Sequence, residues 1–191
     1  REFVLNDLSL EIPKGLITVI IGYSGTGKSV LLKHILGLLQ PTSGTIKILG
    51  HELSQLSDQQ LIQLRCRFGV LFQHAALFDD MTVLENVCFP LQEHRRTMLP
   101  QQVIDIAEKK LQMSGLDKKH FNKLPGELSG GMRKRAGLAR ALALDPDILM
   151  YDEPTTGLDP ILTEMVDNLI VDTHKNHQGS TSLVVTHDLM A

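Results

Sequence analysis

Eight consecutive residues near the N-terminus decide the fold, and they read Gly22-Tyr23-Ser24-Gly25-Thr26-Gly27-Lys28-Ser29. They match the pattern GxxxxGK[ST], in which backbone N–H groups surround a phosphate, the lysine reaches the outer phosphates and the last hydroxyl binds Mg²⁺. Glycine is needed there because a larger side chain would keep a phosphate away from the backbone. We therefore expect the segment from Gly22 to Val30 to bind phosphate, with Lys28 also catalytic and Ser29 also a metal ligand.

The residues on either side of this loop have the patterns of a strand and a helix. Leu16–Ile21 is a short apolar run rich in β-branched residues, which is typical of a strand buried on both faces of a parallel sheet. After the loop, apolar residues recur at helical spacing, and Pro41–Gly44 is expected to end the helix. These apolar residues are Leu31, Leu32, Ile35, Leu38 and Leu39. The chain is thus predicted to form a strand, a glycine loop and a helix in direct succession.

Further strand patterns alternate with helical ones along the chain. Asp7–Ile12 alternates polar and apolar residues, as a half-buried strand does. The other predicted strands are Thr45–Leu49, Phe68–Phe72, Asp147–Tyr151 and Ser182–Val185. This alternation predicts an α/β fold with a mainly parallel sheet.

The middle of the chain has helical patterns and no convincing strand. We expect Thr82 to cap a helix through Leu91, Pro100 to begin a helix ending near Ser114-Gly115, and Ser129 to cap a third helix to about Leu144. The sequence therefore predicts one domain, with an α/β core over residues 1–73 and 145–191 and an inserted helical lobe over 74–144. Because residue 1 is not Met and the chain stops after an apolar run, we expect truncation at both ends.

Length and composition limit the classes of function. With 191 residues, a single domain is expected. The formal charge of −3, 4% aromatic residues and no Trp disfavour a nucleic-acid binder. Cys66 and Cys88 are too few for a disulfide framework or a zinc site, and we expect both to be reduced core residues. No uncharged stretch exceeds 13 residues, so we expect no segment of this chain to cross a membrane.

Two adjacent carboxylates follow another apolar strand pattern. Asp152 and Glu153 end the run that starts at Ile148, and ligands of open α/β sheets bind beyond the carboxyl ends of strands. We expect Asp152 to hold Mg²⁺, as the Walker B acid of P-loop NTPases does. Glu153 is expected to orient and deprotonate the attacking water. The alternative is a pair of solvated acids at a strand end, which the phosphate loop makes the weaker interpretation.

A second candidate anion site opens the helix that follows Leu128. Free N–H groups and the helix dipole attract anions there, and the paired Gly130-Gly131 would admit a phosphate close to the backbone. Here the sequence resembles the nucleotide-binding subunits of ABC transporters, whose LSGGQ signature is similar to Leu128–Met132 with Met in place of Gln. The resemblance covers essentially the whole chain. It implies an α/β P-loop NTPase fold with a mainly parallel core, an antiparallel β edge and an inserted helical subdomain.

This resemblance also implies roles for single residues. Gln73 is similar to the Q-loop glutamine that contacts Mg²⁺ and senses the transmembrane partner. Asp159 resembles the D-loop acid, and His187 resembles the switch histidine that faces the γ-phosphate in catalysis. In this family two copies enclose two ATP molecules, which implies a homodimer in which Ser129, Gly130 and Gly131 bind the partner's nucleotide. The implied activity is ATP hydrolysis with Mg²⁺.

One family feature is not visible in the sequence. The aromatic residue that stacks on adenine normally lies about twenty residues before the phosphate loop in this family. Phe3 is a poor substitute for that residue. Specificity for adenine is therefore implied by the resemblance alone.

A narrower resemblance suggests the transported molecule. The basic residues Arg133-Lys134-Arg135 after the signature, with Gly69–Phe78 and Met81–Val87, are similar to ATPases of the Mce/Mla phospholipid-transport systems. That similarity implies a permease dimer, a lipid-binding Mce protein and a location on the cytoplasmic face of the inner membrane. Pro90–Pro100 is either a permease-facing surface or a solvated loop.

Alternative interpretations remain open at this point. The basic residues Arg133, Lys134, Arg135 and Arg140 would fit a nucleic-acid patch, but a solvated or dimer-facing role is favoured. A soluble ABC-type ATPase of DNA repair or translation would use the same nucleotide residues without a permease. A P-loop kinase leaves the second anion site without a purpose, and a non-hydrolysing subunit would be expected to lack Glu153 or Lys28.

Overall fold

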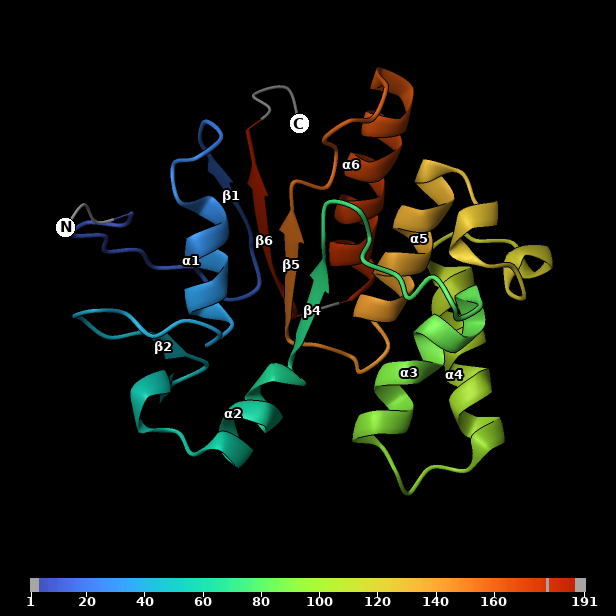
Figure 1. The fold of residues 1–191 in the computed structure, drawn as a ribbon, viewed down its shortest axis with the longest axis horizontal. Helices are drawn as coiled ribbons and strands as arrows, with labels where there is room; N and C mark the ends of the chain where they lie inside the picture. Colours follow the sequence, from blue (N-terminus) through green and yellow to red (C-terminus); the bar gives the residue numbers. More distant parts are fainter. Residues whose placement is uncertain (1–3, 178, 188–191) are drawn as a thin grey trace.

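The structure is a computed structural model that describes residues 4–177 and 179–187. Its centre is a parallel sheet with the strand order β1-β6-β5-β4 (Figure 1). The strands are β1 (Ile17–Ile21), β4 (Phe68–Leu71), β5 (Ile148–Asp152) and β6 (Thr181–Thr186). Every residue of β6 is buried, as expected for a central strand of a parallel sheet that is covered on both faces.

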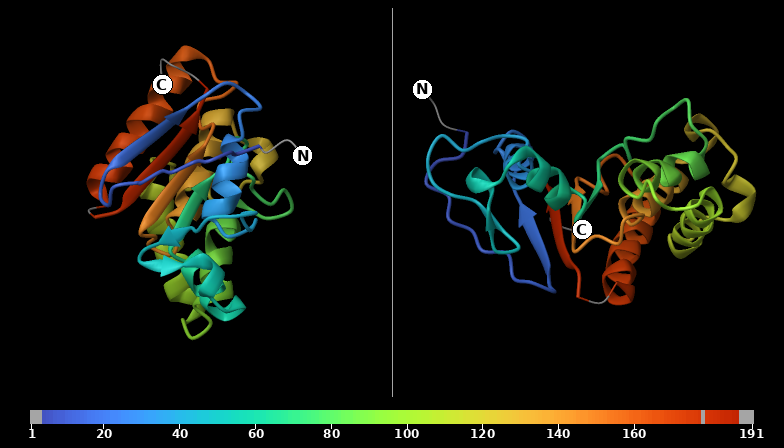
Figure 2. Two further views of the ribbon diagram at one scale, coloured as in Figure 1. Left: turned by 90° about the vertical axis from the view of Figure 1, so that its left-hand side faces the viewer. Right: turned by 90° about the horizontal axis from the view of Figure 1, so that it is seen from below.

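Helices cover both faces of the sheet, as Figure 2 shows. On one face, α1 (Lys28–Ile35) and α2 (Asp58–Arg65) pack Leu32 and Leu64 against Met150 and Leu183. On the other face, α5 (Gly130–Ala141) and α6 (Pro160–Asn176) pack against Leu149, Tyr151 and Val184. Successive residues of β5 and β6 thus enter different clusters, because neighbouring strand side chains point to opposite faces.

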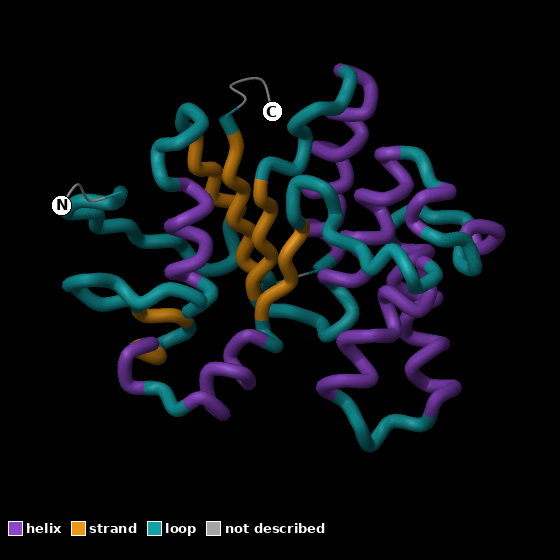
Figure 3. Tube along the Cα trace, in the orientation of Figure 1, coloured by secondary structure: helices purple, strands orange, loops and turns teal. Residues whose placement is uncertain are grey.

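The helical lobe lies beside this core (Figure 3). It contains α3 (Val83–His94), α4 (Pro100–Met113) and α5, with two short 3₁₀ turns at Lys118–His120 and Pro125–Glu127. Another 3₁₀ turn, Leu53–Gln55, lies in the core. Residues 74–144 are all described, and none of them forms a strand. The lobe has its own apolar cluster, which includes Val87, Leu111 and Phe121. Within the described ranges, no helix combines the length and apolar character needed to span a bilayer.

Local signals explain where the lobe helices begin. Thr82 caps α3: its hydroxyl accepts a hydrogen bond from Glu85 N, and Glu85 Oε2 accepts one from Thr82 N at 2.7 Å. Ser129 caps α5 as expected, and Pro100 is the first residue of α4. Cys88 is buried and Cys66 partly buried, and both are free thiols.

Some expected elements are wrong in their extent. Residues 7–12 form no strand in the described structure, and the predicted strand Thr45–Leu49 is reduced to β2 (Lys47–Ile48). This strand pairs antiparallel with β3 (His51–Glu52) in a small separate sheet instead of extending the main one. Helix α5 ends at Ala141 and not near Leu144, whereas α3 continues past Leu91 to His94.

The helix after the phosphate loop ends earlier than its apolar spacing predicts. Gly37 has φ +64°, its N–H donates to His34 O at 3.0 Å, and Leu38 N donates to Lys33 O at 2.8 Å. This is the Schellman pattern of hydrogen bonds, which closes a helix at a left-handed glycine. Leu38 and Leu39 therefore lie beyond the helix and are exposed.

Candidate active site

Three strand ends bring the predicted chemistry to one edge of the sheet. The phosphate loop follows β1, Asp152 and Glu153 lie at the end of β5, and His187 follows β6. Two backbone hydrogen bonds join these ends: Gly22 N donates to Thr186 O at 3.2 Å, and Glu153 N donates to Val185 O at 2.8 Å. A hollow of about 430 Å³ opens here, lined by Val4, Ser24, Gly25, Gly27, Lys28, Ser29, Val30, Gln73, Glu153, Thr156 and His187.

The loop adopts the conformation that its glycines permit. Gly25 and Gly27 have φ values of +83° and +95°, which only glycine adopts without strain. The loop wraps around its own lysine, because Lys28 Nζ donates to Gly22 O at 2.6 Å and to Tyr23 O at 3.0 Å. Thr26 Oγ1 also donates to Tyr23 O, at 2.9 Å. Helix α1 begins at Lys28, so its free N–H groups point at the hollow and favour an anion.

Glu153 lies between two cationic or ionisable side chains. Its Oε1 is 3.3 Å from Lys28 Nζ, and its Oε2 is 2.6 Å from His187 Nδ1. The same Oε2 accepts hydrogen bonds from Thr156 Oγ1 at 3.0 Å and from His187 N at 3.2 Å. Desolvation raises the pKa of Glu153, but the hydrogen bonds from His187, Thr156 and Lys28 outweigh it and hold the pKa below its ordinary value. Glu153 is therefore a carboxylate poised beside the phosphate loop.

Asp152 has an oxygen that no protein group satisfies. Its Oδ1 is buried and has no hydrogen-bond partner within the described residues. Desolvation and the neighbouring Glu153 raise the pKa of Asp152, whereas Lys28 and Lys33 lower it. Ser29 and Gln73 line the hollow, whereas Asp152 is not among its lining residues and lies at the end of β5. A carboxylate, a hydroxyl and an amide oxygen are donors that Mg²⁺ prefers, with phosphates supplying further ligands. The residues present fit a magnesium ion.

The signature residues and Asp159 lie outside this hollow, at the N-termini of α5 and α6. Ser129 Oγ accepts a hydrogen bond from Met132 N at 3.3 Å, and Asp159 Oδ1 accepts from the N–H groups of Ile161 and Leu162 at 3.0 Å each. Gly130 is partly buried. Both polar side chains therefore act as helix caps in the single chain, and neither faces its own phosphate loop.

Gly131 has a packing role that the sequence did not reveal. It is buried, and a Cβ at this position would lie 2.8 Å from Met165 Cε and 3.2 Å from Leu162 Cδ2. The ends of the Met165 and Leu162 side chains of α6 therefore occupy the space that a side chain at residue 131 would need. These contacts join the signature end of α5 to the helix that Asp159 caps.

The sequence analysis did not single out Thr156, and it expected Lys134 and Arg140 to be solvated or to face a dimer partner. Thr156 lies three residues after Glu153 and holds its carboxylate. The expected solvated or dimer-facing position is wrong for Lys134, whose exposed fraction is 4% and whose Nζ donates to Gln73 O. Arg140 is also partly buried, since its guanidinium donates to Ala75 O at 2.9 Å. Burial lowers the pKa of Lys134 to about 8.

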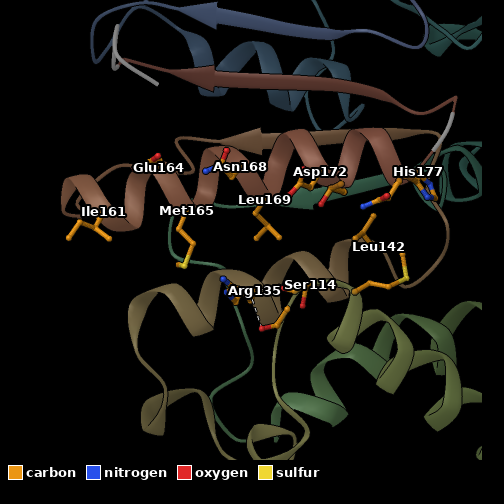
Figure 4. Close-up of a pocket in the computed structure, with 14 residues that line it drawn as sticks. Ser114, Arg135, Leu142, Ile161, Glu164, Met165, Asn168, Leu169, Asp172 and His177 are labelled. Atoms are coloured by element: carbon orange, nitrogen blue, oxygen red, sulfur yellow. Dashed lines mark hydrogen bonds between the residues drawn. The ribbon is translucent and has the colours of Figure 1, made fainter.

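Two further hollows lie away from the phosphate loop. The larger, about 760 Å³, separates α6 from the ends of α4 and α5, and Figure 4 shows Met165, Leu169 and Leu142 along it. None of the expected nucleotide residues lines it. A shallower groove of about 360 Å³ lies between β4 and the lobe, where Phe72, Phe78, Phe89 and Pro90 provide an apolar lining.

Comparisons with known proteins identify the family of this chain. The profile of the family described as ABC transporter matches residues 5–156. The probable ribonucleotide transport ATP-binding protein mkl of Mycobacterium leprae is 48% identical over 97% of this chain and 53% of its own length. The intermembrane phospholipid transport system ATP-binding protein MlaF of Haemophilus influenzae is 46% identical over 97% of this chain and 69% of its own length.

A solved structure shares the fold. It is a dimeric ATP-binding cassette in a post-hydrolysis state bound to ADP and Pi, 35% identical, with a TM-score of 0.85 over 98% of this chain and 81% of that chain. The present chain spans about half the length of the mycobacterial relative, since it covers 53% of that protein.

Proposed function

Because this chain belongs to the ABC transporter family, we propose that it is the ATP-hydrolysing subunit of a membrane transport system. The observation that carries the proposal is the position of Glu153, whose carboxylate lies between Lys28 and His187 beside a phosphate loop. A phosphate cradle, a general base and a histidine thus meet in one hollow.

The proposed reaction follows from what these residues do. The loop N–H groups and Lys28 bind the β- and γ-phosphates of ATP. When ATP binds, the Lys28 ammonium group loses its contact with the Glu153 carboxylate and contacts the γ-phosphate instead. Glu153, released from Lys28, orients the attacking water and accepts its proton at Oε2 or Oε1. The water oxygen bonds to the γ-phosphorus as the bond from that phosphorus to the bridging oxygen of ADP breaks, which gives ADP and phosphate. His187 holds the carboxylate and then the γ-phosphate. Ser29, Asp152 and Gln73 would hold Mg²⁺, which when bound neutralises phosphate charge.

The second part of the proposal is a homodimer. Ser129 and Asp159 are on the outer ends of α5 and α6 and do not reach the phosphate loop of their own chain, so a second copy is the natural recipient of these groups. The dimeric cassette with ADP and Pi, 35% identical to this chain, supports that arrangement. Ser129, Gly130, Gly131 and Asp159 then close the site over the partner's nucleotide.

The third part concerns the cargo and the partners. We propose phospholipid, because the similarity to MlaF, part of an intermembrane phospholipid transport system, covers 97% of this chain. The mycobacterial relative is named for ribonucleotide transport, which makes that cargo the competing candidate. The permease partner would place a segment in the apolar groove of Phe72, Phe78 and Phe89, next to Gln73. The chain would then sit on the cytoplasmic face of the inner membrane, in a complex with an Mce-type lipid-binding protein.

The catalytic part is tested by phosphate release from ATP, measured on the purified protein over a range of protein concentrations. A specific rate that rises with concentration supports hydrolysis by a dimer. No release above background at any concentration would contradict the ATPase proposal.

The cargo is tested by tagging the full-length protein in its own cell and identifying what co-purifies from membranes in mild detergent. A permease, an Mce-domain protein and bound phospholipid are expected. Recovery of a permease without these lipids would contradict phospholipid as the cargo. Recovery with ribosomes or DNA would contradict the role in membrane transport.

A further inference from the structure

Helix α5 directs two cationic side chains at one short segment after β4. Lys134 is buried and donates through Nζ to the carbonyl oxygen of Gln73. Arg140 donates to Ala75 O at 2.9 Å, and its guanidinium lies 5.6 Å from the centre of the Phe78 ring. Among the described residues, neither cation forms an ion pair with a carboxylate. Two carbonyl groups of residues 73–75 are therefore the main polar partners of these cations.

The segment that they hold has an unusual backbone. Ala75 and Ala76 have φ values of +60° and +48°, a left-handed conformation that residues with a side chain seldom adopt. Such a conformation persists only when its surroundings hold it. Helix α5 supplies that support from one side, because a Cβ on Gly137 would lie 2.9 Å from Ala75 Cβ.

The far end of the segment is attached to α3. Asn86 is fully buried; its Oδ1 accepts from Phe78 N at 2.8 Å, and its Nδ2 donates to Phe78 O at 3.1 Å. The segment from Gln73 to Phe78 is thus held by the lobe at both ends, although it follows directly from a core strand.

Lys134 places an ammonium group in the protein interior. An apolar residue of similar volume would avoid the cost of removing an ammonium group from water. The contact of Lys134 with Gln73 is the polar interaction that compensates for that cost. Gln73 itself lines the nucleotide hollow, and Lys134 is on the same helix as Ser129 and Gly130.

We propose that Lys134 is a positioning residue that fixes the backbone of Gln73 to the signature helix, so that Gln73 and the signature end of α5 move as one unit. This inference rests on the proposed function, because it assigns a regulatory link to the same ATPase site. Arg140 supports the link by holding Ala75. A displacement of α5 toward a second chain then carries Gln73 with it.

The test uses the full-length protein and three variants. Lys134→Met keeps the volume and loses the donor, Lys134→Arg keeps a donor, and Lys109→Met is the control because Lys109 is exposed on α4. Steady-state phosphate release should show kcat lowered at least tenfold in Lys134→Met, with the dissociation constant for a fluorescent ATP analogue unchanged within twofold. Lys134→Arg should recover most of the rate, and Lys109→Met should match the wild type.

A second readout reports on the segment directly. These 191 residues contain no Trp, so Phe72→Trp introduces one tryptophan into this sequence, directly before Gln73. ATP should shift its emission in the Phe72→Trp protein, and this shift should disappear when Lys134→Met is added although the nucleotide still binds. If Lys134 only stabilised the fold, Lys134→Met would not abolish the emission shift while leaving nucleotide binding unchanged.

The outcomes distinguish this inference from the proposed function. A wild-type protein without ATPase activity would contradict the proposed function, whereas an active wild type with an equally active Lys134→Met variant would overturn the link. If Lys134→Met does not fold, judged by circular dichroism, Lys134→Leu replaces it, since leucine also has no donor for the Gln73 carbonyl. Wild-type kcat in that folded variant would overturn the link as well.

Discussion

Glu153 Oε2 lies 2.6 Å from His187 Nδ1, while the other oxygen of the same carboxylate lies 3.3 Å from Lys28 Nζ. Glu153 also has φ +49°, so the chain accepts a left-handed residue to direct this carboxylate. The proposed base thus compensates the charge of the phosphate-loop lysine. A γ-phosphate would take the place of the Glu153 carboxylate as the anion beside Lys28. Because the Lys28 ammonium group is already paired with an anion, its further desolvation on ATP binding is limited.

This relationship predicts the behaviour of Glu153→Gln. The amide cannot accept a proton from water, so kcat should fall by a factor of about 10² to 10⁴. Removing a negative charge beside the phosphate loop should strengthen ATP binding, because like charges repel. Phosphate release and binding of a fluorescent ATP analogue measure the two effects. An unchanged rate would remove Glu153 from the role of base.

A second prediction concerns the signature end of α5. Ser129→Arg places a long cation at an exposed cap that does not line the hollow of the chain's own phosphate loop. Hydrolysis should be lost, whereas ATP binding to the single chain should stay within about twofold. Sedimentation with ATP should show fewer dimers than the wild type. A Ser129→Arg monomer that hydrolyses ATP at a concentration-independent specific rate would contradict the shared site.

A third prediction tests the cap of α3 and its pH dependence. Thr82→Ala should lower the free energy of unfolding by about 1 kcal/mol, because the hydroxyl no longer accepts from Glu85 N. The backbone N–H and the hydroxyl of Thr82 hold the pKa of Glu85 below its ordinary value of 4.5. The stabilisation from Glu85 is therefore complete above pH 4.5 and lost as pH falls through the lowered pKa.

The matching measurement is urea unfolding of the wild type and Glu85→Gln between pH 7 and pH 3. The difference in unfolding free energy between the two proteins should shrink on acidification. A difference that stays constant over this range would show that the Glu85 carboxylate makes no ionisation-dependent contribution.

A fourth prediction concerns the contact of α5 with the sheet. A Cβ on Gly69 would collide with the carbonyl oxygen of Ala141 and lie 2.8 Å from Leu149 Cδ2. Backbone cannot yield as a flexible side chain does, so Gly69→Ala should cost about 3 kcal/mol of unfolding free energy. Gly126→Ala is the control, because a Cβ there meets nothing within 4 Å. Equal melting temperatures of the two variants would contradict the close approach.

Local signals in the sequence accounted for much of the fold and the site. The sequence alone located the glycine loop between an apolar strand and a helix, and it located the carboxylates at the end of β5. Both patterns can be found in this way because each depends on a few adjacent residues. The caps at Thr82 and Ser129 are local in the same way. Helix α1 was predicted too long because the left-handed Gly37 overrides the apolar spacing of Leu38 and Leu39.

By itself the sequence determined a phosphate loop with Lys28 and Ser29, the α/β alternation and the helical lobe, since backbone conformation and apolar periodicity are properties of neighbouring residues. Only the tertiary structure decided that Lys134 is buried against Gln73, 61 residues away, and that Gly131 lies against the side chains of Met165 and Leu162 of α6. It also decided that Glu153 joins Lys28 to His187. Such contacts depend on how distant segments pack, and the side chains that make them have no distinguishing pattern along the chain.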